Sequence, residues 1–286
     1  MTGGVLIEAP SARRLILPDR RIIVPTARRR RPRRDALGVL GAAQCGQLSG
    51  GTAPMLIARL QGWTVALYSI AESAYVTQVA GVTSAWADLS PSANNFAATV
   101  GQQPTFTATD ATLANRGSIT GDGATQQMHS ALDLAPPGTT PIRIYTIAKV
   151  VTYVALRRLM AGATTNTLRW RLTNTTNVIA MDNGTATNAN TMVAGTWYRS
   201  SLVYTNTTSD SLRIGNPAAV TGGNAGNNDP TSFCIFADPT PANFASCAYS
   251  MILVVTGSSS LGLAYSNLES ALDLWATRYY CGTVTL

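Results

Sequence analysis

The stretch that decides the fold class runs from residue 142 to residue 184 and reads IRIYTIAKVVTYVALRRLMAGATTNTLRWRLTNTTNVIAMDNG. Short runs rich in Ile, Val, Thr, Tyr and Trp alternate in it with Gly, Asn and Asp. β-Branched and aromatic residues favour strands, whereas Asn, Asp and Gly accept the backbone geometry of tight turns. The stretch is therefore predicted to form consecutive β-strands joined by turns.

The same pattern extends outward from this stretch, from Trp63 almost to the end of the chain. Many short strands with regularly spaced turn signals are typical of an all-β sandwich. The predicted strands are 142–151, 154–160, 167–173, 177–181, 197–204, 211–214, 232–237 and 248–256.

One helix is predicted near the C-terminus. Ser266 and Glu269 have the spacing of a capping box, and Gly282 stands where a helix C-terminus is expected. Between them an apolar stripe recurs at helical period, which predicts a helix lying on the sandwich. The stripe consists of Leu268, Ala271, Leu272, Trp275 and Tyr279.

The composition favours a component of an assembly. The chain is 45% hydrophobic and only 12% charged, about half the usual charged share of a soluble protein. Small polar surfaces with few charges suit packing against identical or neighbouring chains, because desolvating charges is costly. A homo-oligomer is expected. No run approaches the roughly 18 apolar residues that span a bilayer, and no signal-peptide core is visible, so neither a membrane partner nor Sec export is expected.

The first 40 residues carry the electrostatics. Ten arginines stand there against Glu8, Asp19 and Asp35, which gives +7, the net charge of the whole chain. Two apolar triplets, each preceded by an arginine pair and followed by proline, form a short repeat. The predicted anchoring residues are Arg13, Arg14, Leu15, Ile16, Leu17, Arg20, Arg21, Ile22, Ile23, Val24, Arg28, Arg29, Arg30, Arg31, Arg33 and Arg34.

These residues have three interpretations. The proline-terminated triplets predict extended segments able to add to a sheet edge of another protein. The arginine cluster could instead neutralise nucleic-acid phosphates, or be a solvated tail. Anchoring to protein is favoured, because a tail for nucleic acid needs no periodic apolar residues. The predicted organisation is an arm (1–35), a Gly-rich linker with one short helix near 53–61 (36–62), and a β-sandwich (63–286).

Three segments resemble the laminin-G-like, concanavalin A-like domains of phage and bacterial surface proteins. The first comprises 82–90, which includes Trp-Ala-Asp, then Gln-Pro at 103–104 and Gly-Asp-Gly at 121–123. The second is 195–204, which is similar to the central strand of these domains, where the strand follows a glycine turn. The third is 251–255, similar to the closing strand before the helix. The resemblance implies a jelly-roll sandwich over roughly Trp63–Gly282.

Together with the arm, the resemblance implies a structural or adhesive protein of a bacteriophage virion, assembled in the host cytoplasm. The expected role is capsid decoration, head fibre, collar or tail component. Expected partners are capsid, portal or tail proteins and a host-surface glycan, with nucleic acid as an alternative partner of the arm. The alternative function is a free carbohydrate-binding module of a bacterial surface protein.

The residues give little sign of catalysis. No strand carries the alternating carboxylates that glycosidases of this fold use, and the lone His129 has no partner in sequence. The chain is therefore predicted not to be an enzyme and to have no catalytic residue, cofactor or metal. The resemblance alone allows calcium, for which Asp122, Asp182 and Asp210 lie in predicted turns, although ordinary turn capping is favoured.

Two other predictions concern sugars and cysteines. The Asn-rich loops 183–190 and 221–229 offer polar groups to a glycan, whereas Trp86, Trp170 and Trp197 are expected in the core rather than stacked on sugars. The four cysteines, Cys45, Cys234, Cys247 and Cys281, are predicted to be buried reduced thiols. A bridge between Cys234 and Cys247 is the alternative.

Overall fold

The computed structural model describes residues 53–70, 73–132, 141–154, 156–162, 168–173, 177–182, 187–205, 210–222, 232–258 and 261–286. These ranges lie within one compact unit, residues 39–286. The predicted arm and its anchoring residues lie outside the described residues, as do residues 183–186 and 223–229 of the two Asn-rich loops.

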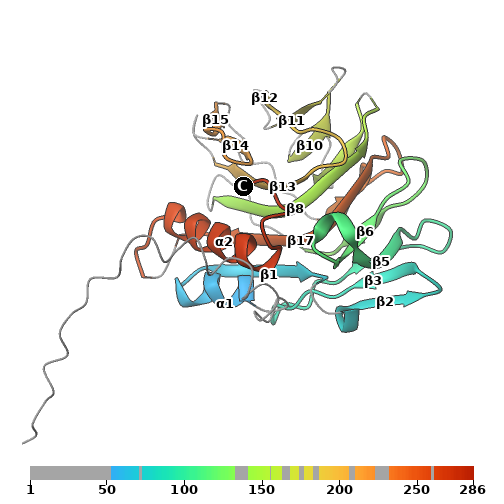
Figure 1. Ribbon diagram of the computed structural model, residues 1–286, viewed down its shortest axis with the longest axis horizontal. Helices are drawn as coiled ribbons and strands as arrows, with labels where there is room; N and C mark the ends of the chain where they lie inside the picture. Colours follow the sequence, from blue (N-terminus) through green and yellow to red (C-terminus); the bar gives the residue numbers. More distant parts are fainter. Residues whose placement is uncertain are drawn as a thin grey trace, which may run out of the picture. The chain divides into compact units, whose positions relative to one another are not determined.

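The described residues form β-strands and two α-helices (Figure 1). The helices are α1 (Ala53–Leu60) and α2 (Tyr265–Tyr279). The strands are β1 (Thr64–Ser69), β2 (Val76–Val79), β3 (Val82–Trp86), β4 (Phe96–Ala97), β5 (Thr105–Asp110), β6 (Arg116–Thr120), β7 (Met128–Ser130), β8 (Ile142–Thr152), β9 (Arg158–Gly162), β10 (Arg169–Leu172), β11 (Val178–Asp182), β12 (Thr187–Thr191), β13 (Trp197–Tyr204), β14 (Ser211–Ile214), β15 (Val220–Thr221), β16 (Phe233–Ile235) and β17 (Ser246–Thr256).

The strands pair antiparallel throughout and form a jelly-roll sandwich of the concanavalin A-like class. One sheet, here named the back sheet, has the order β1–β17–β8–β13–β14–β15. The other, here named the front sheet, has the order β4–β7–β16–β9–β10–β11–β12. Strands β6, β5, β3 and β2 join the two, because β6 pairs with β17 and β3 pairs with β4.

Residues two apart along a strand share a face, and this period separates core from surface. In β8, Ile142 and Ile144 point into the core between the sheets, whereas Tyr145 and Ile147 lie on the opposite face of the back sheet. In β10, Trp170 and Leu172 supply the core from the front sheet. Both sheets thus bury their inner faces against each other.

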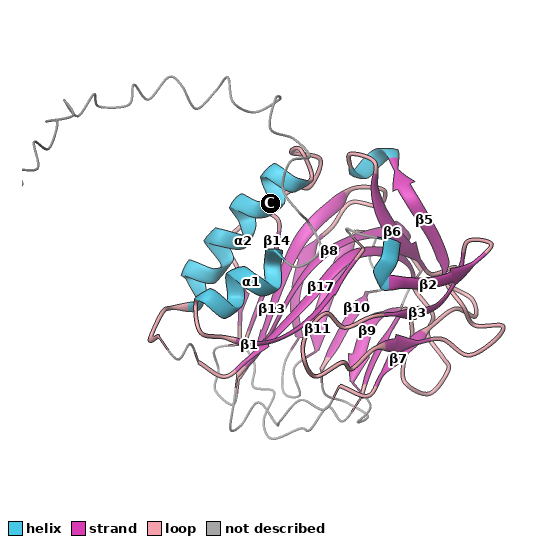
Figure 2. Cartoon of the chain, turned by 90° about the horizontal axis from the view of Figure 1, so that it is seen from below, coloured by secondary structure: helices cyan, strands magenta, loops and turns pink. Residues whose placement is uncertain are grey.

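The two helices cover the outer face of the back sheet (Figure 2). Leu268, Leu272, Trp275 and Tyr279 of α2 are buried there, as the helical stripe predicted, while Ala271 is only half-buried. Helix α1 lies within the predicted linker and buries Ala58 completely against the same cluster. No described helix has the length and apolarity needed to cross a membrane.

The predicted capping box of α2 is wrong. Helix α2 begins at Tyr265 with Ala264 as its N-cap, and no side chain caps it. Glu269 points instead to Arg199 and Arg213, because a salt bridge to the sheet is available on that side. The C-terminus follows the prediction more closely. Cys281 takes a left-handed conformation and the Gly282 N–H donates to the Thr277 carbonyl, as in a Schellman motif.

The Trp86-Ala87-Asp88 segment holds β1 to the loop that follows β3. The buried Asp88 carboxylate accepts N–H groups of Leu67, Ser90 and Asn94 at 2.9–3.1 Å. The ring of Trp86 lies 5.8 Å from that of Tyr68 in the core. The motif that carried part of the resemblance is therefore a structural turn.

The cysteine prediction is correct for two residues and wrong for a third. Cys234 and Cys247 are free and buried, so the alternative bridge between them does not form. Cys281, however, is disulfide-bonded. Exposure explains the difference, since Cys281 lies at the surface after α2, where a second sulfur can approach.

Burial raises the pKa of both Cys234 and Cys247 far above the ordinary value of a thiol. Alkylation requires the thiolate, which is then scarce at neutral pH. We expect iodoacetamide to leave both residues unmodified in the native protein and to label them after unfolding, as read by peptide mass spectrometry. Rapid labelling of either residue in the folded chain would contradict their burial.

Candidate functional site

The outer face of the front sheet carries a row of polar residues that crosses several strands. Residues directly opposite in a ladder share a face, so each pair fixes the next. His129 of β7 is opposite Cys234 of β16, and Cys234 is opposite Ala161 of β9. Ala161 is opposite Arg169 of β10, and Arg169 is opposite Asp182 of β11. The row thus brings together residues far apart in sequence.

A second row lies beside the first on the same face. Arg171 of β10 is opposite Arg158 of β9 on one side and Ala180 of β11 on the other. The loop after β16 contributes Asp238. We name Arg158, Arg169, Arg171, Asp182 and Asp238 together the arginine cluster.

Two ion pairs organise the arginine cluster. The Nε of Arg171 donates to Asp182 Oδ2 at 2.6 Å, and the Nε of Arg158 donates to Asp238 Oδ1 at 3.1 Å. Asn243 holds the other oxygen of Asp238 at 2.6 Å. The four ion-paired side chains are only 12–19% exposed, so their interactions are screened less than those of surface pairs.

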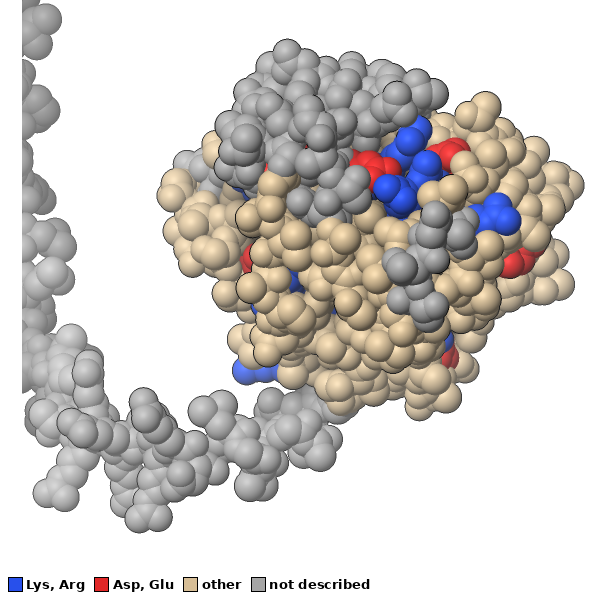
Figure 3. Space-filling model, turned by 90° about the horizontal axis from the view of Figure 1, so that it is seen from above, with Lys and Arg blue, Asp and Glu red and all other residues tan. Residues whose placement is uncertain are grey.

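The arginine cluster has more positive than negative charge. It contains three guanidinium groups and two carboxylates, and the Arg169 side chain makes no hydrogen bond or ion pair within the described residues. Burial lowers the pKa of Arg158, and repulsion from the nearby Arg169 acts in the same direction. Figure 3 shows basic side chains gathered with acidic ones on the face seen from above.

His129, the only histidine of the sequence, lies on this face about 14 Å from Arg169, at three strand spacings. Burial lowers its pKa, so the imidazole is neutral near pH 7. Its Nε2 lies 3.8 Å from the Cys234 sulfur. In a neutral imidazole one nitrogen donates a hydrogen bond and the other accepts one. A hydroxyl group, which also donates and accepts, can pair with either nitrogen.

The three aspartates weighed for calcium have other roles. Asp122 accepts the backbone N–H groups of Ala124, Thr125 and Gln126 at 2.8–3.0 Å, an ordinary turn cap. Asp182 belongs to the arginine cluster, and the buried Asp210 accepts the N–H of Thr205. The described residues contain no group of three or more His, Cys, Asp or Glu side chains that could hold a metal ion.

The three tryptophans considered for sugar stacking lie in the protein interior, as predicted. Trp86, Trp170 and Trp197 are 0–1% exposed. No aromatic side chain of the described ranges is classed as exposed. The described part of the front sheet therefore offers polar side chains on its outer face rather than an exposed aromatic ring.

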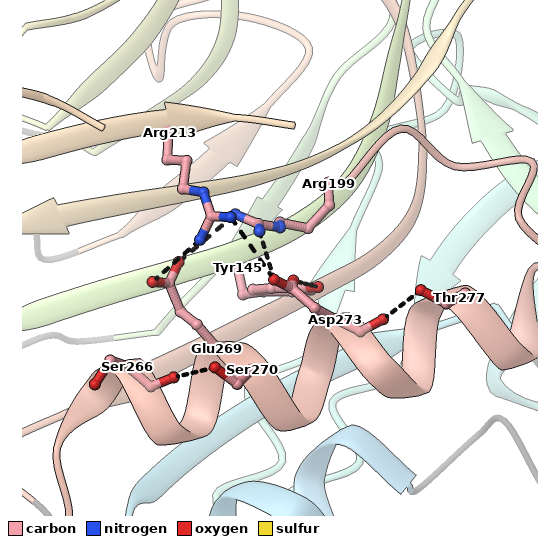
Figure 4. A network of polar contacts seen from close by, with 8 residues as sticks. All are labelled: Tyr145, Arg199, Arg213, Ser266, Glu269, Ser270, Asp273 and Thr277. Carbon is pink, nitrogen blue, oxygen red and sulfur yellow. Dashed lines mark hydrogen bonds and ion pairs between the residues drawn. The ribbon is translucent and has the colours of Figure 1, made fainter. Parts of the chain in front are cut away.

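A second polar network lies under α2 on the other side of the sandwich (Figure 4). Arg199 of β13 is completely buried and pairs with Asp273 of α2 at 2.6 Å. Burial and Asp273 raise the pKa of Tyr145, so its phenol stays protonated and donates to Asp273 at 3.0 Å. Glu269 lies 3.7 Å from Arg199 and 3.8 Å from Arg213. The network connects α2 to the back sheet, and its charged side chains are mostly buried. We infer that it stabilises the fold rather than binding a ligand.

No protein-family model matches the sequence, and no curated protein matches it. Solved structures do match the fold. An arabinofuranosidase complexed with arabinofuranosyl-α-1,2-xylobiose has a TM-score of 0.58 at 10% identity, over 79% of this chain and 65% of that one. The binding domain of Paraclostridial Mosquitocidal Protein 1 has a TM-score of 0.51 at 9% identity, over 75% and 52%. This chain thus spans less than two thirds of either match.

These likenesses correct one prediction. A glycoside hydrolase, a mutant α-L-arabinofuranosidase soaked with a nitrophenyl arabinofuranoside, shares the fold with a TM-score of 0.57 at 10% identity. The prediction that the chain is not an enzyme is contradicted by such matches. That prediction rested on the absence of alternating carboxylates within one strand. Catalytic carboxylates can also come from different strands of a sandwich, so this absence does not exclude an active site.

The arginine cluster was not predictable from local sequence patterns. Its members come from four separate segments, and only strand pairing brings them together. One signal was present: in Arg169-Trp170-Arg171-Leu172 the arginines alternate with core residues, which places both arginines on the outer face of one strand.

Proposed function

We propose that the chain is a glycan-binding protein of a virus particle, in which the outer face of the front sheet binds the sugar and the N-terminal arm attaches the protein to the particle. The observation that carries the first part is the arginine cluster. Sugars are recognised by planar, fixed polar groups, and here two Arg–Asp pairs and Asn243 are held rigidly on strands and a short loop.

The shared fold supports the proposal, since the arabinofuranosidase match is complexed with a sugar. The second part rests on the sequence. The arm contains the only apolar repeat that precedes the sandwich, together with ten arginines, which suits strand addition to an acidic patch of a capsid, portal or tail protein.

Glycan binding is tested with the full chain on an array of bacterial and plant polysaccharides. We expect binding that Arg171→Ala weakens at least about tenfold, because a charge-assisted hydrogen bond contributes about 1.5–3 kcal/mol. Arg278→Ala is the control, because Arg278 is exposed on α2. Absence of binding to every glycan, or equal loss in both variants, would contradict the proposal.

Attachment is tested by deleting residues 1–35, which we expect to leave a folded domain that no longer joins particles. Replacing Leu15, Ile16, Leu17, Ile22, Ile23 and Val24 with Ser keeps every positive charge. Anchoring by strand addition predicts loss of incorporation in this variant. Nucleic-acid binding predicts that the variant still binds, with an affinity that falls steeply as salt rises. Wild-type occupancy by the deleted protein would assign attachment to the sandwich.

A further inference from the structure

The arginine cluster contains an arrangement that weakens the fold. Arg158 and Arg171 lie directly opposite each other on neighbouring strands. Like charges in this position are destabilising, because their side chains stand about 4.5–5.5 Å apart at Cβ. Each has one carboxylate partner, but the third arginine, Arg169, brings another positive charge to the same face.

Hydrogen-bond donors in the cluster also lack acceptors. The Nη1 of Arg158 is buried and has no hydrogen-bond partner. The guanidinium of Arg169 is half-buried and makes no hydrogen bond or ion pair within the described residues. A guanidinium presents five N–H donors in a fixed fork that matches the two oxygens of a carboxylate or sulfate. The unpaired N–H donors therefore favour binding of an anionic acceptor.

We propose that the arginine cluster binds an oxyanion carried by the glycan, either the carboxylate of an acidic sugar or a sulfate ester, with the half-buried Arg169 guanidinium as the principal contact. This inference rests on the proposed function and names its ligand class. Ala161 is opposite Arg169 and Ala180 is opposite Arg171, so at these two positions the neighbouring strands place only a methyl group beside the arginine. The carboxylates of Asp182 and Asp238 hold the neighbouring arginines in place.

The test measures binding of short oligosaccharides to the full chain by calorimetry. Short ligands are used because the ten arginines of the arm would bind long polyanions by themselves. Trigalacturonate is compared with its carboxyl-reduced form, and a sulfated maltotriose with the unsulfated sugar. The protein variants are Arg169→Gln and the control Arg278→Gln, which removes one charge from the exposed surface of α2.

We expect one of the two acidic ligands to bind wild type at least about tenfold more tightly than its neutral form, from the strength of charge-assisted bonds. Arg169→Gln should abolish this preference, and Arg278→Gln should retain it. A preference for trigalacturonate identifies a carboxylate as the ligand, and one for the sulfated sugar identifies a sulfate. The melting temperature of Arg169→Gln should be unchanged or higher, because the substitution relieves repulsion, so loss of binding is separable from unfolding.

Three results would overturn the inference. Equal affinity for the acidic and neutral oligosaccharides would show that the protein binds the glycan but does not recognise its oxyanion. Equal loss in Arg169→Gln and Arg278→Gln would assign the preference to overall charge. A short single-stranded DNA that loses as much affinity in Arg169→Gln as the acidic sugar would make the cluster a general phosphate-binding surface. Failure of every glycan to bind would instead reject the proposed function itself.

Discussion

Replacing Trp275 with Ala is expected to destabilise the protein by about 3–5 kcal/mol, the usual cost of truncating a buried aromatic residue. Trp275 is 4% exposed, and its ring stacks on Tyr279 at 5.2 Å and meets the edge of Tyr280 at 5.7 Å. The helix was predicted to lie on the sandwich, and Trp275 belongs to its buried stripe. In a unit of this size the change corresponds to a melting temperature lower by about 6–20 °C.

The matched control for this prediction lies one residue earlier. Leu274 on the same helix is 53% exposed, so Leu274→Ala changes helix composition without opening a cavity. Its melting temperature should stay within about 2 °C of wild type, as for most surface substitutions. Thermal unfolding followed by circular dichroism measures both variants. A Trp275→Ala protein as stable as the Leu274→Ala protein would mean that α2 does not contribute to the core.

The long strands of the back sheet were predictable because they are rich in β-branched and aromatic residues. Residues 142–151 and 248–256 were predicted and form most of β8 and β17, which pair along the middle of the back sheet. Trp197 to Tyr204 was predicted with the bounds that β13 has. Most residues of these strands are buried, because the inner face packs in the core and α1 and α2 cover the outer face. A short run dense in apolar residues therefore marks each strand without alternation.

The strands that were missed are short, polar or at the sheet margins. Strand β12 reads Thr-Asn-Ala-Asn-Thr, which predicts a loop, yet it pairs with β11 along its whole length. Strand β5 has no fully buried side chain and depends on β6 for its place. Such strands are determined by their neighbours rather than by their own residues, so tertiary context overrides propensity.

The candidate site was less predictable than the fold. Residues such as His129 and Asp182 were noticed individually, but as a lone histidine and a turn residue. Their common face follows from the register β7–β16–β9–β10–β11, which no local pattern records. Each ion pair in the site joins residues at least 11 positions apart, and that between Arg158 and Asp238 spans 80.

The largest electrostatic effect is expected from Asp273→Ala under α2. The substitution leaves the fully buried Arg199 without its 2.6 Å partner, and the remaining contact, to Glu269, is long at 3.7 Å. Removing one member of a buried ion pair costs about 3–5 kcal/mol, because the other charge stays desolvated and uncompensated. Tyr145 also loses the acceptor of its phenol. Urea unfolding should therefore show a clearly lower midpoint for this variant.

Removing both charges of the Arg199–Asp273 ion pair separates the cost of an unpaired buried charge from the cost of lost packing by α2. In the double variant Arg199→Met with Asp273→Ala no buried charge remains, and the methionine fills much of the arginine's space, so most of the lost stability should return. Glu269→Ala should cost less than Asp273→Ala, since its contacts to Arg199 and Arg213 are 3.7 and 3.8 Å long. If the double variant is as unstable as Asp273→Ala, the loss comes from the missing helix contacts, and the buried charge of Arg199 is not what makes Asp273 necessary.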